Sequence, residues 1–142
     1  MTVGHGEKGV GPQQSGYSRF KERIEEIDYV LEDSLFIARD GRVPEDCSVL
    51  VIAGPQSPFL GPEVDALRDY LRQGGSVLAF LDPPFATGLG QLLGEWGVVA
   101  GDDFVIDTSG IGSLMGFDFT TPVAVSFDQE HPIVRKHRAG VM

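Results

Sequence analysis

Cysteine, positive charge and long apolar runs are all scarce in this chain of 142 residues. Cys47 is the only cysteine, which excludes an internal disulfide bond and a cysteine-based zinc site. Acidic side chains outnumber basic ones by 21 to 11, and the resulting net charge of −10 argues against a nucleic-acid partner. No apolar run reaches the roughly 18 residues that a membrane-spanning helix needs. The expected class is a globular domain with no metal and no other cofactor.

Length and composition are those of one ordinary globular domain. Hydrophobic residues make up 42% of the chain and charged residues 23%, close to the averages for soluble proteins. The chain starts with a polar, glycine-rich stretch instead of a signal peptide, and it ends on "KHRAGVM" soon after a strand-like segment. We therefore expect residues 1–142 to form a single α/β domain excised from a longer protein.

Periodicity predicts the first elements of the fold. Tyr17, Phe20, Ile24 and Ile27 recur at helical spacing, with charged residues between them, which predicts an amphipathic helix. The unbroken apolar run at residues 49–53 is typical of a strand that is covered on both faces. Such strands occur mainly in parallel sheets.

Two crossover units then follow along the chain. Residues 61–73 predict a helix, with Pro62 in its first turn and Gly74 as its stop, and residues 76–82 predict a second buried strand. A third helix is predicted by the stripe of Leu89, Leu92, Leu93 and Trp96, and a third strand by residues 102–107.

These elements predict a doubly wound α/β fold. The sheet is mostly parallel, with helices on both faces in a Rossmann or flavodoxin-like three-layer arrangement. From about Thr108 the helical periodicity is lost, and a strand-like stretch lies at residues 123–127. We expect this last part to form an edge hairpin or a loop.

Polar loops that follow the predicted strands are the natural place for a ligand, because ligands of open α/β sheets bind beyond the carboxyl ends of the strands. Three loops meet this condition: "GHGEKG" at residues 4–9, "AGPQSPFLGP" at 53–62 and "LDPPFATG" at 81–88. The candidate ligand-binding residues in these loops are His5, Glu7, Gly54, Gln56, Ser57 and Asp82.

The "GHGEKG" loop does not fit a phosphate-binding motif. It lacks the GxxxxGK[ST] pattern, and its glycines are followed by Val10, Gly11 and Pro12 instead of directly by a helix. His5 and Glu7 could form a base with its orienting carboxylate, or the stretch could be a solvated loop whose glycines serve its turns. Both interpretations stay open.

No residue has the setting of a catalytic nucleophile. A serine or cysteine on a tight turn between strand and helix would be expected of a hydrolase or amidotransferase, but Ser57 lies between prolines and Cys47 precedes its strand. Asp82 could cap a turn or accept a ligand hydroxyl. The acidic residues at 102, 103 and 107 lack the spacing of a calcium loop, and the histidines at 131 and 137 lack partners at metal-ligand spacing.

The order and spacing of these motifs resemble a known family. Residues 4–9, 16–84, 92–107 and the "HPIV" at 131–134 together resemble the extracytoplasmic domain of GldG-type auxiliary components of ABC transport systems, the family linked to bacterial gliding motility. The resemblance implies a Rossmann-like domain related in shape to class I glutamine amidotransferases and without their nucleophile. It also implies membrane-spanning helices beside the domain in the full-length protein.

The expected function combines the resemblance with the missing nucleophile. We expect a non-catalytic binding or scaffold domain that faces the periplasm or cell exterior at the bacterial membrane. Its partners would be an ABC permease and ATPase or other envelope proteins, and its ligand a small polar molecule such as a saccharide. Exposed sheet edges would allow a homo-oligomer. The alternative is a hydrolase or amidotransferase-like enzyme that uses the His5 and Glu7 loop.

Overall fold

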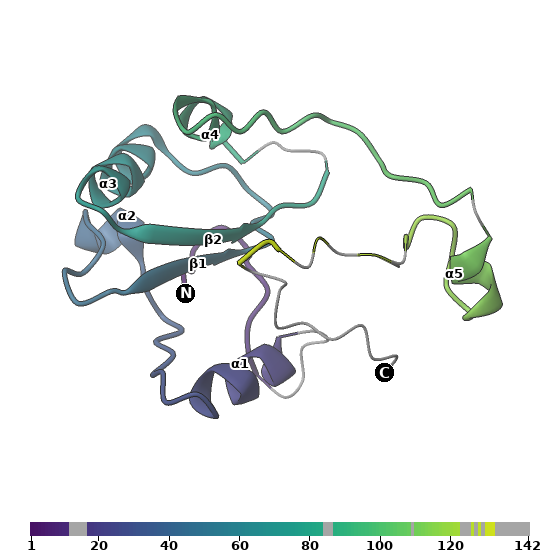
Figure 1. Cartoon of the computed structure of the whole chain (residues 1–142). Coiled ribbons are helices and arrows are strands. Elements are labelled where there is room, and N and C mark those ends of the chain that lie inside the picture. Colours follow the sequence, from purple (N-terminus) through teal and green to yellow (C-terminus); the bar gives the residue numbers. More distant parts are fainter. Residues whose placement is uncertain are drawn as a thin grey trace. The chain divides into compact units, whose positions relative to one another are not determined.

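The computed structural model describes residues 1–11, 17–83, 87–108 and 110–122, together with residues 126, 128 and 130–132 (Figure 1). The chain divides into two compact units, Met1–Asp102 and Asp103–Met142, which are treated separately below. Both contain helix, and the first also contains a small parallel sheet, so the protein is of the mixed α/β class.

The sheet of the first unit consists of strands β1 (Val49–Ala53) and β2 (Ser76–Phe80). They are parallel, with Val51 opposite Leu78, and helix α3 (Gly61–Arg72) connects them. The predicted unit of strand, helix and strand is therefore confirmed. β1 is buried from its second residue onward, as its unbroken apolar run predicted.

The N-terminal segment lies along the other side of β1. The amide of Thr2 donates a hydrogen bond to the carbonyl oxygen of Val51 (3.0 Å), and that of Lys8 donates to Ala53 (2.8 Å). Thr2 also forms an isolated parallel bridge with Leu35. Residues 35, 2, 51 and 78 thus lie side by side in that order. The segments that contain Leu35 and Thr2 pair over too few residues to count as strands.

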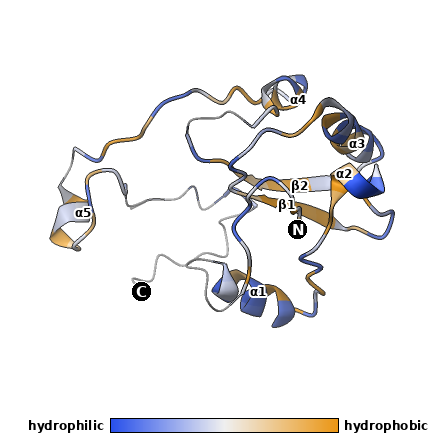
Figure 2. Ribbon diagram, turned by 180° about the vertical axis from the view of Figure 1, so that it is seen from behind, coloured by the Kyte–Doolittle hydropathy of each residue, from blue (hydrophilic) through white to orange (hydrophobic). Residues whose placement is uncertain are grey.

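Apolar side chains pack on both faces of the sheet. Leu50 and Ile52 of β1 belong to a core cluster with Leu67 of α3, whereas Val51 and Ala53 belong to a second cluster. Tyr17 and Phe20, at the start of the predicted amphipathic helix α1 (Ser18–Glu25), pack against this second cluster. Figure 1 accordingly shows α1 and α3 on opposite sides of β1 and β2, and Figure 2 shows both strands largely in the hydrophobic colour.

The first unit also contains two short helices, α2 (Ile37–Asp40) and α4 (Gly90–Glu95). α4 matches the helix predicted from the leucine stripe, and Leu89 and Leu92 are buried as expected. Trp96 differs, since it follows α4 and its side chain is 53% exposed. No helix among the described residues is long and apolar enough to cross a bilayer.

The strand expected at residues 102–107 is wrong, and so is the full burial of β2. Phe104 and Val105 are each about 70% exposed, and no strand includes them. A short apolar stretch becomes a strand only when another strand pairs with it. In the second unit the amide of Asp107 donates a hydrogen bond to the carbonyl oxygen of Phe119 (2.8 Å), but neither residue belongs to a described strand. β2 alternates between half-buried and exposed positions, so Leu78 and Phe80 remain partly exposed.

The second unit contains one short helix, α5 (Ile111–Leu114), among its described residues. Asp107 supports it, because its carboxylate accepts a hydrogen bond from the amide of Gly112 (3.1 Å). The strand-like stretch at 123–127 falls almost entirely outside the described residues, as does His137. The predicted edge hairpin is therefore not among the described features.

Candidate functional site

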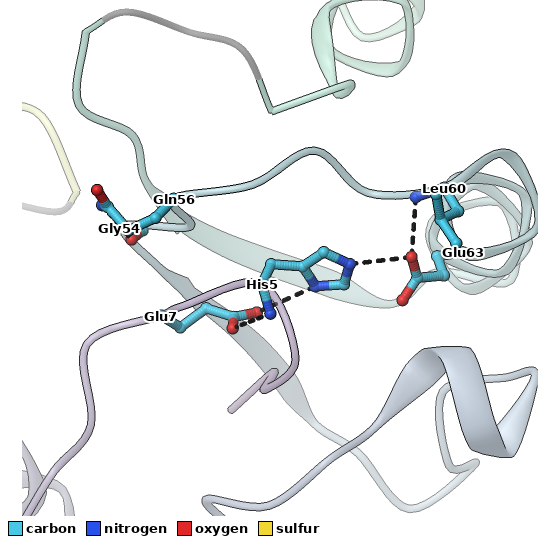
Figure 3. A network of polar contacts seen from close by, with 6 residues as sticks. All are labelled: His5, Glu7, Gly54, Gln56, Leu60 and Glu63. Carbon is cyan, nitrogen blue, oxygen red and sulfur yellow. Dashed lines mark hydrogen bonds and ion pairs between the residues drawn. The ribbon is translucent and has the colours of Figure 1, made fainter.

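His5 lies at the centre of a buried polar cluster at the carboxyl ends of the strands (Figure 3). Its side chain is 9% exposed, and its Nε2 atom lies 3.0 Å from Oε2 of Glu63, whose side chain is 3% exposed. A carboxylate in its ionised form only accepts hydrogen bonds, and with that form of Glu63 the donor in this contact is Nε2. The pair joins the N-terminal segment to α3 across 58 positions of sequence.

Glu63 also caps its own helix. The same Oε2 atom accepts a hydrogen bond from the amide of Leu60 (2.8 Å), just before the first turn of α3. Capping of this kind satisfies one of the amides that an α-helix leaves without an internal partner. One carboxylate therefore fixes both the start of α3 and the ring of His5. Its second oxygen, Oε1, is buried and has no hydrogen-bond partner among the described residues.

Glu7 faces the other side of the imidazole. Its Oε2 atom accepts a hydrogen bond from the backbone amide of His5 (2.8 Å), while Oε1 lies 3.5 Å from Nδ1 of the ring. That second separation allows an ion pair when the ring is protonated but is too long for a good hydrogen bond. Both ring nitrogens of His5 thus face carboxylates of the protein itself.

The backbone of His5 ties two loops together. Its carbonyl oxygen accepts hydrogen bonds from the amides of Gln56 (2.7 Å) and Ser57 (3.0 Å), in the loop after β1. Gly6 is next to this contact at φ +78°, and a Cβ atom there would lie 3.1 Å from Cβ of Gln56. Glycine is therefore required both for the backbone conformation and for the close approach.

Phe59 covers the ring of His5 in the same loop. The two rings stack with centroids 4.0 Å apart and an interplanar angle of 25°. Phe59 is in turn held by the segment after β2, because its amide donates a hydrogen bond to the carbonyl oxygen of Thr87 (2.9 Å). A Cβ atom on Gly88 would come within 2.8 Å of the Phe59 carbonyl oxygen. The N-terminal loop around His5, the loop after β1 and the loop after β2 are thus packed against one another.

A second polar link lies nearby but is exposed to solvent. Nζ of Lys8 is 3.2 Å from Oδ2 of Asp82, and the two side chains are 47% and 62% exposed. Gly54, at φ +60°, lies beside this pair, since a Cβ atom there would be 3.5 Å from both side chains. The side-chain amide of Gln56 donates to the carbonyl oxygen of Gly54 (3.0 Å). This exposed group could contact a ligand without any rearrangement of the core.

The six candidate residues therefore fall into two sets. His5, Glu7 and Gly54 are partly or fully enclosed, whereas Gln56, Ser57 and Asp82 are exposed. Three further residues belong to the arrangement and are not among the candidates predicted from the sequence. Phe59 and Glu63 could have been found only through contacts distant in sequence, and Lys8 could have been found from its place in the "GHGEKG" loop.

The arrangement contains neither a nucleophile–base pair nor a metal centre among the described residues. Ser57 meets His5 through its backbone amide, whereas a catalytic serine would need its hydroxyl on a ring nitrogen. Cys47 lies before β1, and the Tyr70 hydroxyl donates to its carbonyl oxygen (3.1 Å). Within the described ranges, no group of three or more histidine, cysteine or acidic side chains could hold a metal ion.

Comparison with known proteins identifies the family. A family model described as "ABC-type uncharacterized transport system" matches residues 1–137, nearly the whole chain. Comparisons with curated proteins and with solved structures give no match. The family match covers both the buried cluster around His5 and the exposed pair of Lys8 and Asp82. The chain therefore belongs to this family, that of auxiliary components of ABC-type transport systems.

Proposed function

We propose that this chain is a non-catalytic, extracytoplasmic binding domain of a GldG-type auxiliary component, associated with gliding motility. It is one α/β domain of a longer, membrane-anchored protein and faces the periplasm or cell exterior. There it contacts the ABC permease and ATPase or other envelope proteins. Membership of the transport family supports this role, and the chemistry of the His5 cluster supports the absence of catalysis.

The observation that carries the proposal is the placement of His5. A general base needs a ring nitrogen that can reach the proton it removes. In this chain one ring nitrogen lies 3.0 Å from Glu63, the other faces Glu7 at 3.5 Å, and Phe59 stacks on the ring. The histidine is thus directed into the protein, where it fastens loops instead of meeting a substrate.

The topology supports a place for the ligand at the carboxyl ends of the strands. The N-terminal segment leads to α1 on one face of the sheet, while the neighbouring strand β1 leads to α3 on the other. Ligands of doubly wound sheets bind where adjacent strands send their connections to opposite faces. We propose the full three-layer, flavodoxin-like arrangement for this reason, with the ligand beside Lys8, Gln56, Ser57 and Asp82.

The chemistry of these groups suits a small polar ligand such as a saccharide. Lys8 supplies an ammonium donor, Asp82 a carboxylate acceptor and Gln56 an amide that does both. All three lie around Gly54, and all are accessible. Neutral polyols need such a mixture of donors and acceptors, whereas a strongly anionic ligand would be repelled by the net charge of −10.

The test is a binding measurement on the 142-residue chain. A panel of mono- and oligosaccharides is titrated while backbone amide signals are followed by NMR. We expect saturable shifts near Gly54, and a loss of affinity of at least tenfold in Lys8→Ala and Asp82→Ala. Arg39→Ala is the matched control, since Arg39 also forms an exposed ion pair, with Asp40 (2.7 Å), outside the proposed site. Equal affinities in all three variants would contradict this site.

The same chain is assayed for hydrolysis of amide, ester and glycosidic substrates. This measurement addresses the alternative function, a hydrolase or amidotransferase-like enzyme. In that enzyme His5 would act as the base and Glu7 as its orienting carboxylate. We expect no turnover. Turnover that is lost in His5→Gln and kept in Arg39→Ala would replace the binding function by a catalytic one.

Association through sheet edges is a further part of the proposal. Among the described residues β2 pairs with β1 alone, so its outer edge has unpaired backbone groups. Such an edge is a template for pairing with a second copy. Sedimentation at increasing protein concentration would reveal the homo-oligomer, and a monomer at every concentration would exclude it.

A further inference from the structure

A separate, apolar cavity lies between the helices and the sheet of the first unit. It has a volume of about 250 Å³ and is bounded by α3, β2 and the α4 region. Its lining is almost entirely hydrocarbon and includes Leu67 and Leu71 of α3, Val77 and Ala79 of β2, and Leu92 and Leu93 of α4. Trp96 and Val98, which follow α4, also line it. It shares no lining residue with the polar site around Gly54.

The cavity is half open. Its lining includes Leu67, Leu89 and Leu92, which are at most 5% exposed, but also Trp96 and Val98, which are each about half exposed. Water that enters this space finds hardly any polar partner on the lining, so an apolar group that displaces it buries hydrocarbon surface. An enclosed apolar cavity of about 150 Å³ already accommodates benzene, so the volume here is sufficient for a small hydrocarbon group.

The walls of the cavity are held in place by an ion-pair network. Nε of Arg68 on α3 lies 2.9 Å from Oε2 of Glu95 at the end of α4, and Arg68 also contacts Asp65. The hydrogen bond that Arg68 donates to Glu95 raises the pKa of the Arg68 guanidinium above its ordinary value. This network holds α4 against α3, and both helices line the cavity. The ion pairs therefore help to keep the cavity walls in place.

We infer that this cavity binds the apolar part of a small molecule, either an alkyl chain or a hydrocarbon ring. The hydrocarbon lining selects for apolar groups, and the volume sets the size. Trp96 lines the cavity and is half exposed, and its indole N–H is a donor that a polar head group can use. The inference is independent of the polar site, because the two sites are lined by different residues.

The sequence contains one tryptophan, so its fluorescence reports directly on the cavity. The 142-residue chain is titrated with octan-1-ol, and with glucose as a polar control, while Trp96 emission is recorded. We expect a saturable change with octan-1-ol and none with glucose. Absence of a saturable change would overturn the inference. So would a change that depends on protein concentration and accompanies dimer formation, because a second copy would then fill the cavity.

Variants test whether the ligand occupies this space. Ala79→Leu fills part of the cavity and should weaken octan-1-ol binding at least tenfold, whereas Ala38→Leu makes the same change at an exposed position on α2 and should leave it unaltered. Equal affinities would overturn the inference. If Ala79→Leu fails to fold, nuclear Overhauser contacts between octan-1-ol and the methyl groups of Ala79 and Leu92 in the unaltered chain decide the matter, since their absence at saturation would exclude this cavity.

Discussion

The two ends of the parallel sheet are fastened by different chemistry. At the amino ends of the strands, the neutral hydroxyl of Tyr70 lies 3.1 Å from the carbonyl oxygen of Cys47 and accepts a hydrogen bond from the amide of Ser76 (3.2 Å). At the carboxyl ends, each link joins a basic side chain to a carboxylate, His5 to Glu63 and Lys8 to Asp82. Pairs of basic and acidic side chains thus lie at the end where ligands of such sheets bind.

Depth separates the two links at the carboxyl end. The side chains of His5 and Glu63 are 9% and 3% exposed, whereas those of Lys8 and Asp82 are 47% and 62% exposed. A buried charged group must keep its partners, since it has no water to replace them. An exposed pair can exchange its partner for a ligand at little cost. The deep link should therefore govern stability, and the shallow one binding.

The largest effect is expected from Glu63→Ala. The change removes the cap from the part-buried Leu60 amide and leaves His5, in a buried setting, without its closest partner. Removing the acceptor of a buried donor costs about 1–3 kcal/mol in the free energy of unfolding, and loss of the helix cap adds about 1 kcal/mol. Urea denaturation measures it. The control is Asp65→Ala on the same helix, whose side chain is 71% exposed and whose loss should cost less than about 1 kcal/mol. Equal losses of stability in Glu63→Ala and Asp65→Ala would contradict a stabilising role for the buried contact between His5 and Glu63.

Gly88→Ala should have the next largest effect. The residue has φ +73°, and the added Cβ atom would lie 2.8 Å from the backbone carbonyl oxygen of Phe59, which cannot move without disturbing the stack on His5. The matched control is Gly41→Ala, with φ +68° and no atom within 4 Å of the added Cβ. The left-handed conformation alone costs about 1–2 kcal/mol. Denaturation curves should show Gly88→Ala losing more than Gly41→Ala, and the reverse order would exclude the clash.

At the amino end, Tyr70→Phe should cost about 1 kcal/mol, the usual contribution of a hydrogen bond. Its effect should depend on pH. Burial, followed by the hydrogen bond to Cys47, raises the pKa of Tyr70 above its ordinary value near 10. Because the folded form holds the proton more tightly, this contribution is complete below pH of about 10 and is lost as the pH rises toward the folded pKa.

The measurement is urea denaturation at pH 8.5 and pH 10.5. Tyr70→Phe should reduce the loss of stability between these two conditions. Tyr29→Phe, at a side chain that is 56% exposed, should leave that loss as it is in the unaltered chain. An identical alkaline loss in both variants would show that the Tyr70 hydroxyl does not contribute to it.

The local elements of the fold could be predicted from the sequence because their signals are local. Pro62 at the start of α3, Gly74 after its end and the apolar run of β1 all act within a few residues. The strand at 102–107 was predicted from the same kind of signal and was wrong. A strand exists only through its partner, and a short apolar stretch does not itself encode whether a partner is present.

The site was predictable in part for a topological reason. Parallel strands bring their carboxyl ends to one edge, so the loops that carry His5, Gln56 and Ser57 were expected to meet, and backbone hydrogen bonds join them. The burial of His5 was not predictable. It depends on Glu63, 58 positions away, and on the stacked ring of Phe59. Such contacts follow from packing and have no short sequence pattern.

The smallest effect on stability, and the sharpest contrast with Glu63→Ala, is expected from Lys8→Ala. Exposed ion pairs contribute about 0–1 kcal/mol, and salt screens them, so denaturation in 0.5 M sodium chloride should erase any difference from the unaltered chain. Lys21→Ala on α1 is the control, because Lys21 also forms an exposed pair, with Glu25 at 4.0 Å. The two variants should be equally stable and yet differ in ligand affinity, since only Lys8 lies beside Gly54. A stability loss in Lys8→Ala as large as that in Glu63→Ala would mean that depth does not separate the two links, and the shallow pair would then belong to the structural framework.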